Sequence, residues 1–199
     1  MKLTEIKSTN PTKQWLDKMK IKKYTINQDG SVDVDGDVNI SNKKLTKIPV
    51  QFGKVGGSFY CYNNNLTSLQ GAPRNVRSDF YCDNNNLTSL QGAPTEVGGR
   101  FLCNYNKLTS LQGAPTNVGG SFYCDNNKLT NLHNIHKIIK SIKFDFDCED
   151  NPIKSHILGL IRIKQLTEVA MDNTSVEEII NRHLQSGRDI QACQMELID

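Results

Sequence analysis

The sequence contains no long apolar run. No window of its 199 residues approaches the roughly 18 to 20 apolar residues of a membrane-spanning helix. The first residues, Met1-Lys-Leu-Thr-Glu-Ile6, are not followed by the apolar segment of an export signal. We therefore expect a soluble protein without an export signal, and a chain of this length with 37% apolar residues is expected to form a single domain.

Patterns typical of catalysis and metal binding are also missing. The sequence has no glycine-rich phosphate loop, and no serine or cysteine has an evident histidine and acid partner. His133 and His136 lie one helical turn apart, but no third ligand is spaced for a metal site. Asp33-x-Asp35-x-Asp37 resembles part of a calcium loop, although Lys44 occupies the position of the last EF-hand carboxylate. We therefore expect no enzyme activity, no cofactor and no metal site.

The chain does contain a repeat of 21 residues. The segment Leu66-Thr-Ser-Leu-Gln-Gly-Ala-Pro73 recurs with the same eight residues at 87–94 and 108–115, and a fixed period of this length predicts a stacked array. In each unit a Phe-x-Cys step places both apolar side chains on one face of a short strand. Val76 and the leucines of the unit are expected to close the core from the returning segment.

The repeat predicts where the strands lie. Four units are unambiguous, and shifting the pattern along the chain adds one unit before them and two after them. We predict seven parallel strands that contain, in order, Val38, Phe59, Phe80, Phe101, Phe122, Phe146 and Val169. The glycine pairs at 98–99 and 119–120, together with Gly71 and Pro73, indicate tight turns on the convex side.

An asparagine follows each strand, at positions 64, 85, 106, 127 and 151. We expect these amides to stack and to satisfy backbone groups that would otherwise lack partners. Substitution of Asn85 is therefore expected to cost more than its exposure suggests. The first unit is degenerate because it has Lys43 at this position.

Five of the six cysteines share one repeat position. They are Cys61, Cys82, Cys103, Cys124 and Cys148. Their parallel directions and odd number favour a reduced, buried column over disulfides, and a linear column does not supply a tetrahedral zinc site. Reduced thiols indicate a cytoplasmic protein.

The ends of the chain differ from the repeats and are expected to cap the array. At the N-terminus, Asn10-Pro11-Thr12 predicts a helix start with Trp15 and Met19 on its apolar stripe. Tyr24–Ile26 and Val32–Val34 predict a hairpin. We expect Trp15 to cover the first repeat.

At the C-terminus, Pro152 to Ile163 predicts a helix on the convex side, and Thr174 and Ser175 each start a capping box. An apolar stripe follows, formed by Val176, Ile179, Ile180 and Leu184. A further short helix is expected from Asp189, with Cys193 facing inward. The predicted boundaries are 1–36 for the N-terminal cap, 37–152 for the repeats, and 153–199 for the last repeat with the helical cap.

The strand residues that alternate with the core are expected side by side on the concave face. The column before each core aromatic is Asp37, Ser58, Asp79, Arg100, Ser121, Asp145 and Glu168; the middle column is Asn39, Tyr60, Tyr81, Leu102, Tyr123, Asp147 and Ala170; the column after each cysteine is Ser41, Tyr62, Asp83, Asn104, Asp125, Glu149 and Asp172. Nine acids against one arginine give this face a formal charge of −8, whereas the whole chain carries +3.

This face is the predicted partner-binding site. Its candidate residues are Tyr60, Tyr62, Asp79, Tyr81, Asp83, Arg100, Leu102, Asn104, Tyr123, Asp125, Asp147 and Glu149. Tyrosines are enriched at interface hot spots, and surrounding acids can steer a basic protein partner. The simpler alternative is that tyrosine favours strands and that carboxylates keep the surface soluble.

The alternative function is nucleic-acid binding by the N-terminal segment. Residues 1–23 contain seven lysines against Glu5 and Asp17. Phosphate contacts require lysine or arginine on the binding surface, so the acidic face itself would repel a nucleic acid. The oligomeric state stays open, because an unpaired final strand could pair with another copy.

The unit Phe-x-Cys-x-x-Asn-x-Leu resembles the leucine-rich repeat form Leu-x-Leu-x-x-Asn-x-Leu. The chain also resembles small leucine-rich repeat proteins of large bacteriophages, through Trp15-Leu-Asp-Lys-Met19, the segments 32–38, 176–180 and 193–198, and the Leu-Thr-Ser-Leu-x-Gly-x-Pro units. The resemblance implies an α/β solenoid that acts in the bacterial host cytoplasm. There it would bind a host or phage protein, and inhibition of a defence or host enzyme is one form that such binding would take.

Overall fold

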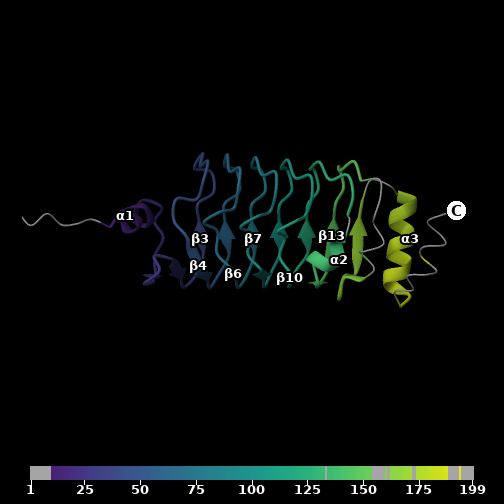
Figure 1. Ribbon diagram of the computed structural model, residues 1–199. Coiled ribbons are helices and arrows are strands. Elements are labelled where there is room, and N and C mark those ends of the chain that lie inside the picture. The colour runs from purple at the N-terminus through teal and green to yellow at the C-terminus, as the bar shows by residue number, and fades with distance from the viewer. Residues whose placement is uncertain are drawn as a thin grey trace, which may run out of the picture.

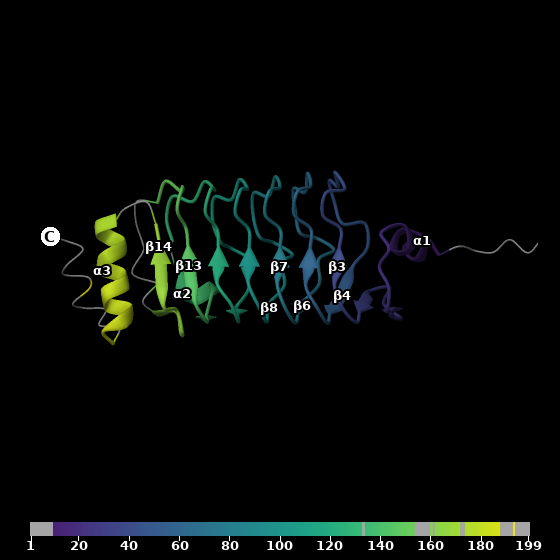
Figure 2. The ribbon, with the colours of Figure 1, turned by 180° about the vertical axis from the view of Figure 1, so that it is seen from behind.

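The computed structural model describes residues 10–132, 134–153, 160, 162–171, 174–187 and 193. The described chain forms an elongated β-solenoid whose turns lie side by side along an almost straight axis (Figure 1). Helix α1 (Pro11–Lys18) lies at one end and helix α3 (Thr174–Gln185) at the other, as the view from behind also shows (Figure 2).

The seven predicted parallel strands are confirmed and form one sheet, which we call the Phe sheet. Its strands, in spatial order, are β3 (Val38–Asn39), β5 (Phe59–Tyr60), β7 (Phe80–Tyr81), β9 (Phe101–Leu102), β11 (Phe122–Tyr123), β13 (Asp145–Asp147) and β14 (Glu168–Ala170). Equivalent residues pair directly, for example Phe59 with Phe80 and Phe80 with Phe101. The repeat period therefore sets the strand register.

The returning segment forms a second sheet, which the sequence analysis missed. This Val sheet contains β1 (Tyr24–Ile26), β2 (Val32–Val34), β4 (Phe52–Val55), β6 (Asn75–Val76), β8 (Glu96–Val97), β10 (Asn117–Val118) and β12 (Ser141–Ile142). Most turns thus close with a short strand, not with a helix. The expected α/β class is corrected to a β-solenoid with few helices.

The core is built from repeated columns of side chains. The five phenylalanines of the Phe sheet are completely buried, and the rings of Phe59 and Phe80 stack at 5.4 Å with an interplanar angle of 8°. Phe80 and Phe101 repeat this arrangement at 5.5 Å and 7°. Stacked aromatic pairs of this kind add roughly 0.5 to 1.5 kcal/mol beyond the area they bury.

The expected column of reduced cysteines is confirmed, since all five of its cysteines are buried and outside disulfides. The Sγ atoms of Cys82, Cys103, Cys124 and Cys148 each donate to a carbonyl of the next turn at 3.2 or 3.3 Å. Burial raises the pKa of the Cys61, Cys82, Cys103 and Cys124 thiols. They stay protonated and therefore unreactive.

The asparagine column also behaves as predicted. The Nδ2 of Asn85 donates to the carbonyls of Cys61 in the preceding turn and of Cys82 in its own turn, at 3.0 and 3.1 Å. Its Oδ1 accepts the Leu66 amide at 2.9 Å. Each such amide joins two turns. Lys43 is tolerated at the first position because β3 is the first strand of the Phe sheet.

The N-terminal elements match their predictions. Asn10 starts α1 by accepting the Thr12 amide at 2.9 Å, and β1 pairs antiparallel with β2 as a hairpin. Leu16 is the completely buried residue of α1, while the half-buried Trp15 meets the Phe52 ring edge-on at 6.3 Å. Trp15 thus contacts β4 of the Val sheet.

At the opposite end, α3 packs along β14, which is the last strand of the Phe sheet. The Asn181 side chain accepts the Val169 amide at 2.7 Å and donates to the Val169 carbonyl at 2.9 Å. Glu177 accepts the Met171 amide at 2.8 Å. Ile180 and Leu184 are buried, as the apolar stripe predicts.

Some predictions fall largely or wholly on residues outside the described part of the chain. These are most of the helix over 152–163, the side chains of Thr174 and Ser175, His133, Asp172, and the helix from Asp189 apart from the buried Cys193. Phe122 and Phe146 are 24 residues apart, three more than the repeat period, and the short helix α2 (Ile135–Ile138) lies between them.

Candidate functional site

The twelve predicted site residues all lie on the strands β5 to β13 or directly beside them, at positions that alternate with the buried core. Each is partly or fully exposed. We call the outer surface formed by the three columns of the Phe sheet the acidic face. In both views the turns that carry this face stack along an almost straight line (Figures 1 and 2).

Tyrosines form a compact cluster near the N-terminal half of the acidic face. The rings of Tyr60 and Tyr81 stack at 5.1 Å, and Tyr62 meets Tyr60 edge-on at 6.4 Å. The Tyr81 hydroxyl donates to Asp79 Oδ2 at 3.1 Å. Burial and the Asp79 charge raise the pKa of Tyr81 to about 12. Tyr81 therefore stays neutral at physiological pH.

The column before the core aromatics is less available than predicted. Asp79 Oδ1 accepts the Arg100 amide of the next turn at 2.7 Å, and Asp37 accepts the Ser58 amide at the same distance. The Ser58 hydroxyl accepts the Asp79 amide at 3.2 Å. These side chains therefore join neighbouring turns, and Asp79 also accepts a hydrogen bond from the Tyr81 hydroxyl.

The column after the cysteines combines acidic side chains with a buried amide oxygen. The half-buried Asp83 has a pKa raised by burial and by the Asp125 charge. Between them in the column lies Asn104, whose buried Oδ1 has no hydrogen-bond partner in the described structure. A buried acceptor without a donor is costly. The Asn104 Oδ1 acceptor therefore lacks a hydrogen-bond donor.

The described part of the acidic face carries eight acids and one arginine, a formal charge of −7. Burial, followed by the charges of Asp125 and Glu149, raises the pKa of Asp147 to about 6. This carboxyl is charged at neutral pH and takes up a proton when the pH falls below about 6. The negative charge of the acidic face is consequently largest at neutral pH and above.

No protein-family model, no curated protein and no solved structure matches this chain. The function of the protein is therefore inferred from the site itself.

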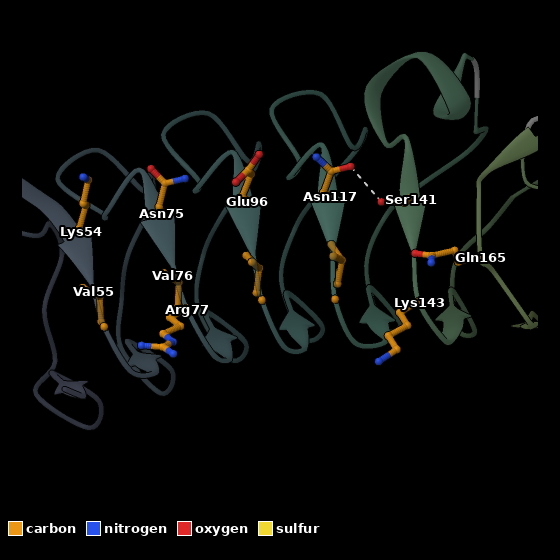
Figure 3. A pocket seen from close by; sticks show the side chains of 15 residues that line it. Lys54, Val55, Asn75, Val76, Arg77, Glu96, Asn117, Ser141, Lys143 and Gln165 are labelled. Atoms are coloured by element: carbon orange, nitrogen blue, oxygen red, sulfur yellow. Dashed lines mark hydrogen bonds between the residues drawn. The ribbon is translucent and has the colours of Figure 1, made fainter. Parts of the chain in front are cut away.

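Sequence reasoning missed a second surface, on the outer side of the Val sheet. A shallow groove of about 640 Å³ runs across β4, β6, β8, β10 and β12 (Figure 3). Its signal was present in the repeat, because a polar residue comes immediately before each of the buried residues Val55, Val76, Val97 and Val118. That pattern was read as part of a returning segment and not as a strand.

Neither a metal centre nor a membrane span emerges from the described residues. No three of their His, Cys, Asp and Glu side chains are grouped so that they could hold a metal ion. None of the helices in this part of the chain combines the length and the apolar character needed to cross a bilayer.

Proposed function

We propose that this protein is a non-enzymatic binding module whose acidic face captures a basic protein. The observation that carries the proposal is the column after the cysteines, in which Asn104 lies between the partly exposed carboxylates of Asp83 and Asp125. A lysine or arginine side chain from a partner donates to these carboxylates and offsets their charge. Charge-assisted hydrogen bonds of this kind are about twice as strong as neutral ones.

The tyrosine cluster supports the same partner class. The faces of aromatic rings attract ammonium and guanidinium groups, and Tyr62 precedes Asp83 in the column after the cysteines. Rigid aromatic side chains lose little conformational entropy on binding, which is one reason why they dominate interface hot spots. A basic partner would therefore meet aromatic area and negative charge together.

The double substitution Tyr81→Ala with Asp83→Lys tests this proposal. It removes the ring stacked on Tyr60 and reverses one charge of the recognition column. We expect affinity for the partner to fall about 30-fold or more, since hot-spot truncations cost roughly 2 kcal/mol. The partner is first identified by affinity purification with mass spectrometry, and binding of each variant is then measured by calorimetry.

The chain offers a chemically matched control. Tyr105→Ala with Glu96→Lys makes the same tyrosine truncation and an equivalent acid-to-lysine reversal outside the three columns, at an exposed tyrosine and on the Val sheet. This control should keep the affinity of the unmodified protein. If both double variants bind equally well, the acidic face is not the binding surface.

We further propose that the array is a leucine-rich repeat solenoid of phage origin, capped by α1 with its hairpin and by α3. The asparagine column supports this kinship, because its amides join each turn to the preceding one at the position where the repeat pattern expects them. Within this proposal the partner is a host or phage protein in the bacterial cytoplasm, and binding inhibits a defence or host enzyme.

A second candidate function is nucleic-acid binding through the N-terminal segment. Four exposed lysines follow one another closely there, namely Lys18, Lys20, Lys22 and Lys23. If this function holds, a gel shift with short duplex DNA should weaken as salt rises and should diminish in a Lys18→Ala, Lys22→Ala variant. Deleting residues 1–23 is a poorer test, because it also removes the buried Leu16. No shift at low salt excludes this function.

A further inference from the structure

We propose that the groove on the Val sheet binds an extended acidic peptide, separately from the acidic face. The groove is bordered by two rows of side chains (Figure 3). One row contains Lys54, Asn75, Glu96 and Asn117, each from a successive strand of the sheet. The second row contains Arg77 and Lys143 near its two ends.

Glycines lie between these two cations. Gly98 and Gly119 occupy the second row between Arg77 and Lys143, where neighbouring turns nearly touch. The second row therefore carries no long side chain between the two cations. A slender, extended chain fits this shape better than a folded domain.

Charge indicates which kind of chain would bind. The groove lining contains three exposed cations, Lys54, Arg77 and Lys143. Glu96 is the one acid among the lining residues. The Lys143 ammonium also lies 5.2 Å from the centre of the Phe144 ring. This surface carries the opposite sign to the acidic face, which makes it complementary to carboxylates.

Strand spacing predicts the pattern of those carboxylates. Arg77 and Lys143 belong to β6 and β12 turns, which are three strand spacings apart, or about 14 Å. An extended peptide advances about 3.4 Å per residue, so acids at positions i and i+4 reach both cations. Glu96 disfavours an acid between them. The side-chain amide of Asn75 can form hydrogen bonds with the peptide backbone.

A peptide is favoured over single-stranded nucleic acid. Proteins that bind single strands present aromatic side chains on which the bases stack, and the groove lining contains no aromatic residue. Glu96 would also repel a continuous phosphate backbone. These two features leave an acidic peptide as the ligand that the groove fits.

Fluorescence anisotropy with the intact protein and two labelled peptides of equal composition tests the inference. The probes are Glu-Thr-Val-Thr-Glu and Thr-Glu-Glu-Val-Thr. We expect the first to bind several-fold more tightly, and Arg77→Glu to weaken it about tenfold. Glu96→Gln should improve binding of the second peptide. Lys143→Glu provides an independent variant at the opposite end of the groove, and a melting curve for each variant confirms folding.

Lys128→Glu is the matched control, because it makes the same charge reversal at an exposed lysine away from the groove. It should bind like the unmodified protein, as should the Tyr81→Ala, Asp83→Lys variant of the acidic face. Equal binding of the two peptides, no binding of either, or no effect of Arg77→Glu and Lys143→Glu would overturn the proposal. Tighter binding of an oligothymidine would assign the groove to nucleic acid instead.

Discussion

Replacing Asn85 by alanine should lower the free energy of unfolding by about 3 to 5 kcal/mol. The substitution removes the amide that serves the Leu66 N–H and the carbonyls of Cys61 and Cys82. Each buried backbone group left without a partner costs roughly 1 to 3 kcal/mol. Because these groups belong to two different turns, the loss weakens the joint between them. Urea denaturation followed by circular dichroism measures the change.

The neighbouring repeat supplies the control. Asn65 follows the column residue Asn64 directly, yet it is exposed and its side chain makes none of the hydrogen bonds recorded in the described structure. Asn65→Ala should change the free energy of unfolding by less than about 0.5 kcal/mol. Similar losses at Asn65 and Asn85 would show that the asparagine column does not hold the turns together.

Replacing Gly98 by alanine should be similarly damaging, at a cost of about 3 kcal/mol or more, because overpacking against atoms that cannot move is severe. A Cβ at this corner would collide with the Arg77 carbonyl of the preceding turn. The backbone there is fixed, since the Gly98 amide donates to the Val76 carbonyl at 2.9 Å. Thermal unfolding should show a clearly lowered Tm.

Gly56 occupies the same repeat position one turn before Arg77, and there a Cβ would come no closer than 3.4 Å to any neighbour. Gly56→Ala should therefore leave the Tm nearly unchanged. A loss at Gly56 as large as that at Gly98 would indicate a conformational requirement for glycine and not a close approach of neighbouring turns.

This distinction also separates two kinds of glycine in the repeat. The sequence predicts tight turns at Gly71 and at the pairs 98–99 and 119–120, without the reason for glycine at each position. In the structure the φ angles of Gly71, Gly92 and Gly113 are +94°, +90° and +87°, whereas these pairs are not in the left-handed region. Glycine occurs there because neighbouring turns nearly touch. Sequence alone does not separate these two causes.

Features of the fold that depend on one repeat were predictable from the sequence. The Phe-x-Cys step sets a strand, and the following asparagine has a simple role in satisfying backbone groups. The Val sheet was missed because each of its strands β6, β8 and β10 contributes a single buried apolar residue, whereas each Phe-x-Cys step contributes two. A single buried residue shows no alternation of its own. Its pairing becomes visible only when neighbouring turns are placed side by side.

The candidate site was predicted in its position but not in its internal contacts. Periodicity alone indicates that Tyr81 and Asp83 share the outer surface of the Phe sheet. It does not show that Asp79 accepts the Arg100 amide, although the frequent Asp and Ser at that position are short hydrogen-bond acceptors that could have suggested it. The unpaired Asn104 Oδ1 requires coordinates to detect.

The contacts of α3 have a consequence for polymer growth. An exposed edge strand is a template onto which another chain can add. At β14 the Val169 amide and carbonyl already bond Asn181, and the Met171 amide bonds Glu177. A strand from a second molecule would have to displace α3 before it could pair here. At this end, α3 therefore prevents a second molecule from extending the Phe sheet into a fibre.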